Sequence, residues 1–153
     1  GKEVQMWRNV GLPWMVSLFI LAVLGFPGCG QEQEKAELKV VNPAFSIRKD
    51  GETSYAVDAK GLIRNTGQVD VKAVEVTGHC ETCNEKVIEG EWFVSEYDKM
   101  AHQKDVIRYL AAGDEASFEF QDVAFCMASR SENAPTELPE GLKISIESWE
   151  VVE

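Results

Sequence analysis

The sequence has 153 residues and a formal net charge of −11 at pH 7. This length fits one domain with a buried core. The acidic balance argues against a nucleic-acid partner, because binding to phosphates needs a stripe of Lys and Arg, and none follows residue 29. Nor do the side chains favour attachment to an anionic lipid surface.

An apolar segment near the start of the chain predicts a leader. Arg8 follows Met6 and precedes an apolar run over residues 16–26, in which Ser17 is the one polar side chain. The run has the length of a signal-peptide core, about 7–15 residues, and falls short of the roughly 20 that a membrane-spanning helix needs. We therefore predict a signal peptide over residues 1–28, with Met6 as its true start.

The leader ends at a cysteine. Gly28-Cys29-Gly30 resembles a lipobox, in which a small residue before the cysteine admits the lipoprotein peptidase. The resemblance implies that Cys29 is acylated and holds the protein in the bacterial outer membrane, facing the periplasm or the cell surface. Phe26 and Pro27 depart from the usual pattern, since leucine is common at the first of these positions and proline is uncommon at the second. Ordinary secretory cleavage nearby and an uncleaved anchor are the alternatives.

Residues 29–37 are predicted to be a lipid-anchored tether. Gln and Glu dominate residues 31–37, which are polar and show no periodicity. We expect the tether to be mobile and the folded domain to span residues 38–153.

The domain begins with strand patterns separated by turns. Residues 44–48 alternate between apolar and polar, and Asp50-Gly51 then supplies a pair that tolerates a tight hairpin turn. Residues 55–64 alternate as well, so their odd positions should face the core. Residues 65–67, Asn-Thr-Gly, provide the next turn.

The following strand pattern, residues 69–76, changes phase between Ala73 and Val74. That change predicts a bulge, or a strand that passes from one sheet edge to another. Further strands are expected at residues 91–94, 105–110, 116–120 and 142–151. Residues 95–104 are the only stretch whose pattern also fits a helix. Their apolar residues follow the helical period too weakly to predict more than a loop or one helical turn.

Short strands with turn residues between them predict an all-β, immunoglobulin-like antiparallel β-sandwich. Alternating residues of one strand must point to the same face, so the apolar positions of several strands should meet. The residues expected to share this core are Tyr55, Val57, Ile63, Val76, Leu110, Phe118 and Phe120.

The order of these patterns resembles a known family. Residues 61–67 (GLIRNTG) end a strand in an Asn turn, residues 74–76 form a valine strand, and residues 110–120 (LAAGDEASFEF) lead from a Gly turn into a Phe strand. This order is similar to the FxLYD family and the related bacterial CARDB modules, and it implies an immunoglobulin-like fold. Ala112 stands where the family has proline, and the insert at residues 78–91 lies outside the pattern. Such a fold does not imply a function.

The insert carries the most specific chemistry of the chain. Cys80 and Cys83 lie two residues apart within the sequence His-Cys-Glu-Thr-Cys-Asn. In an oxidising envelope such thiols form a disulfide. With Cys29 set aside, we predict a Cys80–Cys83 disulfide, with Cys126 reduced and buried like a small apolar residue.

Two alternatives use the same thiols. A closed zinc site needs four N or S ligands. The available set is Cys80, Cys83, Cys126 and either His79 or His102. A redox-active pair would need a thiolate stabilised by a helix N-terminus, whereas Glu81 and Glu85 would raise the thiol pKa.

No catalytic residue or cofactor is assigned. His79 and His102 are the only histidines, and the chain lacks a nucleophile elbow, a phosphate loop and a zinc-protease motif. Trp92 and Trp149 are expected to belong to the sandwich core or to cross-strand pairs rather than to a sugar-binding platform. The sequence therefore predicts a non-catalytic interaction or structural module that contacts another envelope protein. A metal-binding or thiol-redox lipoprotein is the alternative.

Overall fold

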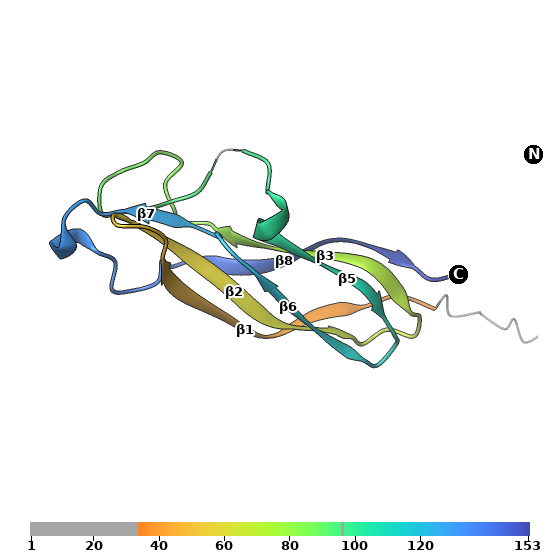
Figure 1. Ribbon diagram of the computed structural model, residues 1–153. Coiled ribbons are helices and arrows are strands. Elements are labelled where there is room, and N and C mark those ends of the chain that lie inside the picture. Colours follow the sequence, from red (N-terminus) through yellow and green to blue (C-terminus); the bar gives the residue numbers. More distant parts are fainter. Residues whose placement is uncertain (1–33, 96) are drawn as a thin grey trace, which may run out of the picture. The chain divides into compact units, whose positions relative to one another are not determined.

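The computed structural model describes residues 34–95 and 97–153. The predicted signal peptide and the acylation site Cys29 lie outside the described residues. The described chain folds as predicted, into an all-β, immunoglobulin-like antiparallel sandwich of two sheets (Figure 1). Within this part of the chain, no helix has the length and apolar character needed to cross a membrane.

The first sheet is built around a long hairpin. Its strands are β1 (Leu38–Lys49), β2 (Ser54–Asn65), β6 (Glu115–Phe120), β7 (Phe125–Met127) and β4 (Trp92–Phe93). The strand β1 pairs with one edge of β2. On the other edge, residues 59–64 of β2 pair with β6 and residues 54–56 pair with β7. Thus β6 and β7 follow each other along the same edge, and β4 extends the sheet beyond β7.

The second sheet has β3 (Val71–Cys80) at its centre, between β5 (Lys104–Leu110) and β8 (Leu142–Val151). The predicted bulge in β3 is confirmed. Ala73 has a positive φ of 50°, and the register between β3 and β8 shifts between Lys72 and Glu75. Because the bulge adds one residue, the apolar side chains on both sides of it return to the same face.

Both predicted turns are present, and each is fixed by hydrogen bonds. At the β1–β2 hairpin, the Asp50 N–H donates to the Ser54 carbonyl over 2.9 Å, and Gly51 has a φ of +140°. Asn65 ends β2 and is fully buried. Its amide donates to the carbonyls of Val69 (2.8 Å) and Leu110 (3.3 Å), and its side-chain oxygen accepts the Gly67 N–H at 3.0 Å.

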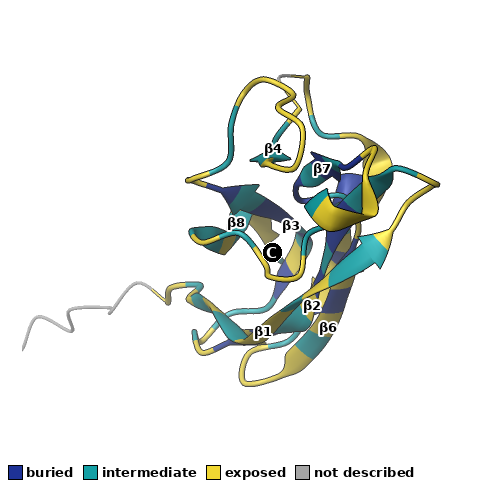
Figure 2. Cartoon of the chain, turned by 90° about the vertical axis from the view of Figure 1, so that its left-hand side faces the viewer, coloured by how far each residue is buried: buried dark blue, intermediate teal, exposed yellow. Residues whose placement is uncertain are grey.

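The core lies between the two sheets, where Figure 2 shows the buried segments facing one another. Six of the seven predicted core residues belong to it: Val57, Ile63, Val76, Leu110, Phe118 and Phe120. The prediction for Tyr55 was wrong, because this residue is only half-buried and lies outside the cluster. It is the second residue of β2, beside the hairpin turn and outside the cluster of buried residues between the sheets.

Part of the predicted tether is docked on the domain. The Glu37 carbonyl accepts the Thr66 N–H at 2.7 Å, and the Lys35 carbonyl accepts the Gln68 N–H at 3.1 Å. A Cβ at residue 67 would overlap the Lys35 carbonyl, so glycine is needed there for the close approach. The ordered domain therefore begins before residue 38.

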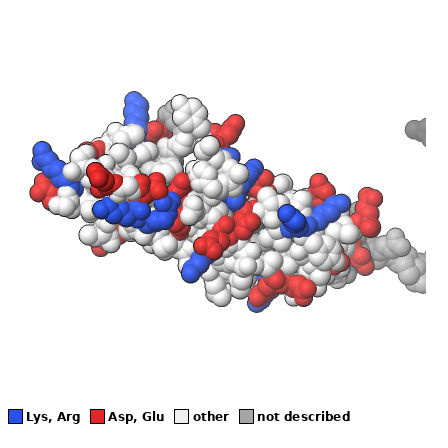
Figure 3. All heavy atoms as spheres, in the orientation of Figure 1, with Lys and Arg blue, Asp and Glu red and all other residues white. Residues whose placement is uncertain are grey.

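The stretch predicted as a loop or one helical turn contains a single 3₁₀ turn, η1 (Ala101–Gln103), directly before β5. A second such turn, η2 (Ser131–Asn133), lies between β7 and β8. Acidic and basic side chains are intermingled over the face of the domain seen in Figure 3. Exposed pairs of this kind add little stability, typically 0–1 kcal/mol each, so the packing of the sheets supports the fold.

Candidate functional site

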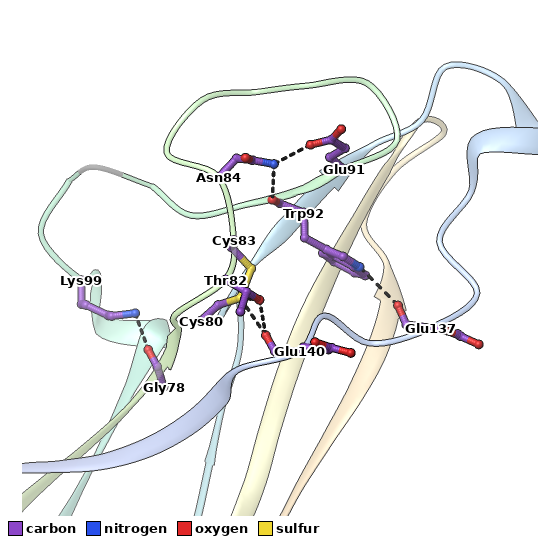
Figure 4. Close-up of a disulfide and its surroundings, with 10 residues drawn as sticks. All are labelled: Gly78, Cys80, Thr82, Cys83, Asn84, Glu91, Trp92, Lys99, Glu137 and Glu140. Carbon is purple, nitrogen blue, oxygen red and sulfur yellow. Dashed lines mark hydrogen bonds between the residues drawn. A yellow bond between two sulfur atoms is a disulfide. The ribbon is translucent and has the colours of Figure 1, made fainter.

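A disulfide marks the end of the central strand β3. Cys80, the last residue of β3, is bonded to Cys83, with 5.5 Å between their Cα atoms (Figure 4). Cys126 is a free cysteine, buried in β7. Both features match the sequence prediction.

The disulfide loop is attached to the segment that leads into β8. The Glu140 carbonyl accepts a hydrogen bond from the Thr82 hydroxyl and lies 3.7 Å from the Cys80 sulfur, which has no hydrogen to donate because it is part of the disulfide. The Glu81 N–H donates to the Gly141 carbonyl at 3.0 Å. Nearby, the Trp92 indole donates to the Glu137 carbonyl at 3.2 Å, as Figure 4 shows. Two loops far apart in sequence are thus joined.

Asn84 closes the next part of the loop. Its N–H donates to the Trp92 carbonyl at 2.9 Å, and its own carbonyl accepts the Val94 N–H at 2.9 Å. Its side-chain amide also donates to the Glu91 carboxylate at 2.7 Å. Residues 84–94 therefore form a closed loop, and the position of β4 is fixed by backbone contacts.

A groove of about 1020 Å³ lies beside this loop. It is lined by Glu85, Val87, Phe93, Val94, Ser95, Tyr97, Asp98, Met100, His102, Gln103, Asp122 and Phe125. The rings of Phe93 and Phe125, from the paired strands β4 and β7, have centroids 5.8 Å apart. Three large side chains are strongly exposed, namely Tyr97 (88%), Met100 (63%) and Val87 (62%). The groove thus presents apolar surface to solvent.

A network of charged side chains surrounds Asp122, which lines the groove. This carboxylate lies 2.5 Å from Arg48 Nη2 and 3.0 Å from His102 Nε2. Arg48 also pairs with Asp58 at 2.8 Å and with Asp50. The hydrogen bonds to Asp58 and then Asp50 raise the pKa of Arg48, so the guanidinium stays charged. Asp122 therefore already has partners within the domain, although it shares the charge of Arg48 with Asp50 and Asp58.

Two further acidic residues in the described lining of the groove differ from Asp122. Glu85 and Asp98 form no ion pair with any residue that the structure describes. Lys99 follows Asp98, but its ammonium donates to the Gly78 carbonyl at 2.6 Å. Burial lowers the pKa of this lysine, and the nearby Glu147 opposes the shift. The groove lining therefore carries unpaired negative charge.

His79 lies outside the groove, beside Glu147. Its Nε2 is 2.8 Å from Glu147 Oε1 and 3.3 Å from the Thr77 hydroxyl oxygen. The hydrogen bond from His79 is the main cause that lowers the pKa of Glu147. A hydroxyl, an imidazole and a carboxylate meet here, but both partners contact the same ring nitrogen. A catalytic relay needs the two partners on different nitrogens, so this cluster does not have the geometry of one.

The structure does not bring the alternative zinc ligands together. Cys80 and Cys83 are bonded to each other, Cys126 is buried in the other sheet, and each histidine is held by a carboxylate. Among residues 34–95 and 97–153, no three His, Cys, Asp or Glu side chains are arranged to hold a metal ion.

The two tryptophans behave differently. Trp92 is half-buried and packs against the core, as predicted. Trp149 is 43% exposed and outside the core cluster, so it does not pack in the core, and the prediction that it forms a cross-strand pair stays untested. Trp149 lies on β8, which has β3 as its only partner strand in the described chain. The side chains of such an edge strand have neighbours on one side only, so more of their surface stays exposed.

Sequence reasoning missed the groove. Its residues come from the insert, from η1 and from β7, and each apolar residue looks ordinary in its own segment. The one available signal is that Val87, Tyr97 and Met100 are large apolar residues in stretches with no strand or helix period.

No family model, no curated protein and no solved structure matches this chain.

We expect Cys126 to resist iodoacetamide in the folded protein and to react in urea. Burial, and to a lesser degree Glu89, raise the pKa of this thiol, and burial also excludes the reagent. Peptide mapping by mass spectrometry without reduction should recover Cys80 and Cys83 as a linked pair. A cross-linked peptide containing Cys126, or stoichiometric zinc released on acidification, would contradict this assignment.

Proposed function

We propose that the protein is a lipid-anchored envelope protein that acts as a non-catalytic interaction module and contacts another envelope protein through its groove. The observation that carries this proposal is the set of exposed apolar residues in one groove, Val87, Tyr97 and Met100. Single exposed apolar residues are common on soluble proteins, whereas a contiguous exposed patch marks an interaction site.

The position of the groove supports the proposal. Residues 35–37 contact the turn at residues 66–68, just before β3 begins. The disulfide lies at the other end of β3, ten residues later. At about 3.3 Å per residue, the two ends are roughly 30 Å apart. An anchor at Cys29 would therefore hold the groove at the end of the domain away from the membrane, where an envelope partner has access.

Two further features support a module rather than an enzyme. The contacts of Thr77 and Glu147 with a single nitrogen of His79 do not make a proton relay. In addition, residues 61–67 and 110–120 resemble the turns of FxLYD and CARDB modules, and Asn65 ties these two segments together through the Leu110 carbonyl.

The alternative is a metal-binding or thiol-redox lipoprotein that uses Cys80 and Cys83. In the structure both sulfurs are occupied by the disulfide, so either role would first require a reductant. Thiol mapping of protein taken directly from cells separates the two proposals. A reduced pair favours the redox or metal role, and an oxidised pair favours the module.

In-cell photo-crosslinking tests the interaction. A crosslinking amino acid at Val87 is expected to give a discrete adduct of higher mass in the membrane fraction, because this side chain is exposed in the groove. The matched control is the same amino acid at Ala112, an exposed residue close to the Asn65 turn at the opposite end of the domain. Equal adducts at both positions, or none at Val87, would contradict the proposal.

The same cells test the anchor. The Cys29→Ser variant should lose acylation, accumulate as a precursor and lose the adduct at Val87. Membrane attachment of the wild-type protein with an intact leader, seen by mass spectrometry, would exclude lipoprotein processing in favour of a spanning anchor.

A further inference from the structure

We infer that the groove binds an apolar peptide segment that carries at least one basic residue, supplied by another envelope protein. This inference rests on the proposed function and adds the chemistry of the partner. It follows from three properties of the groove: its exposed apolar lining, its pre-formed floor and its unpaired carboxylates.

The lining favours side chains of a peptide. Tyr97 and Met100 are exposed by 88% and 63%, and they stand beside the partly buried rings of Phe93 and Phe125. Aromatic residues and Met are enriched where proteins bind one another, since they bury much apolar area, and the unbranched Met side chain adapts to different shapes. The volume, about 1020 Å³, is at the upper end of small-ligand sites, so a few side chains fit.

The floor is already in place without a partner. Phe93 lies on β4, which is held by pairing with β7 and by the backbone contacts of Asn84. The Cys80–Cys83 disulfide and the hydrogen bond from the Thr82 hydroxyl to the Glu140 carbonyl fix the start of the same loop, as seen in Figure 4. A floor fixed in advance lowers the entropy lost on binding.

The charges select a cation. Glu85 and Asp98 line the groove without an ion pair in the described chain, while Asp122 is already bound by Arg48 and His102. No Lys or Arg is among the lining residues. A basic residue on the incoming segment would meet opposite charge, and an acidic one would be repelled. The same repulsion disfavours fatty acids and anionic lipid headgroups, which leaves a basic peptide as the matching occupant.

The test uses the full-length protein in phosphatidylcholine nanodiscs and a random peptide library, with empty discs to remove background binders. Enriched peptides should combine apolar residues with Lys or Arg. The strongest one, labelled with fluorescein, is then measured by anisotropy beside a charge-swapped version with Glu in place of each basic residue. The swapped peptide should bind roughly tenfold more weakly or not at all.

Variants locate the binding. Met100→Glu should weaken binding about tenfold, because it puts a charge in the apolar lining, and its exposed position spares the fold. Asp98→Lys should weaken it severalfold, and this difference should shrink in about 0.5 M salt, where exposed charges are screened. Asp114→Lys, with the same charge change at the exposed turn beside Asn65, is the control and should bind as the wild type does.

The possible failures are distinguishable. Enriched peptides without basic residues, or unchanged binding by Asp98→Lys, would overturn the inferred occupant. Binding to phosphatidylglycerol vesicles that Met100→Glu abolishes would overturn it in favour of a lipid surface. If the adduct at Val87 still forms in cells in these cases, the proposed function stands and only the occupant is wrong. Absence of both the adduct and the peptides overturns both proposals.

Discussion

Replacing Phe118 with alanine is expected to lower the free energy of unfolding by about 3–5 kcal/mol. The side chain is 2% exposed and stacks on Phe120 with ring centroids 5.7 Å apart. Its ring also lies directly over Gly61 of β2, where a Cβ would be 2.7 Å from the ring carbon Cζ. Surrounding residues relax only partially around such a cavity, so most of the lost contacts are not replaced.

Urea unfolding of residues 34–153, followed by tryptophan fluorescence, measures this loss. The matched control is Ser117→Ala, since Ser117 is the exposed neighbour on the same strand and should change stability by less than about 0.5 kcal/mol. A loss under about 1 kcal/mol for Phe118→Ala would show that this side chain does not fill the core.

The second large effect is expected at Asn65. Asn65→Ala should cost on the order of 2–4 kcal/mol, because it removes the partners of three buried or partly buried backbone groups, and each unsatisfied group costs about 1–3 kcal/mol. Asn65→Asp should be at least as harmful. A carboxylate can accept from the Gly67 N–H but cannot donate to the carbonyls of Val69 and Leu110.

The same urea measurement applies, with Thr66→Ala as the control. Thr66 is exposed, and its hydroxyl makes one long hydrogen bond of 3.3 Å to the Glu37 carbonyl, so its loss should cost well under 1 kcal/mol. If Asn65→Ala and Thr66→Ala were equally mild, the buried amide would not be what holds this turn.

Local patterns account for the parts of the fold that the sequence predicted. Alternation identified the buried face of β2, and the phase change at Ala73 identified the bulge. The Asp50-Gly51 pair identified the hairpin. In each case the pattern and the structure involve residues close in sequence, so period and turn chemistry were sufficient.

The groove depends on contacts between distant segments. Phe93 and Phe125 meet because β4 pairs with β7, and β7 pairs with the start of β2. Strands of two and three residues are too short to show a period. The prediction for Tyr55 failed for a related reason, since alternation predicts which face of a strand is buried but not where along the strand the opposite sheet covers that face.

The attachment of residues 35–37 beside the Asn65 turn has a mechanical consequence. A force that acts between a tether at the start of β1 and a partner in the groove is directed along the strands. The reason is that β1 and β3 both begin at the end of the domain where residues 35–37 are attached. The hydrogen bonds between β1 and β2 lie across this direction. They are loaded together in shear rather than opened one after another, so the domain resists tension along the line that joins the tether to the groove.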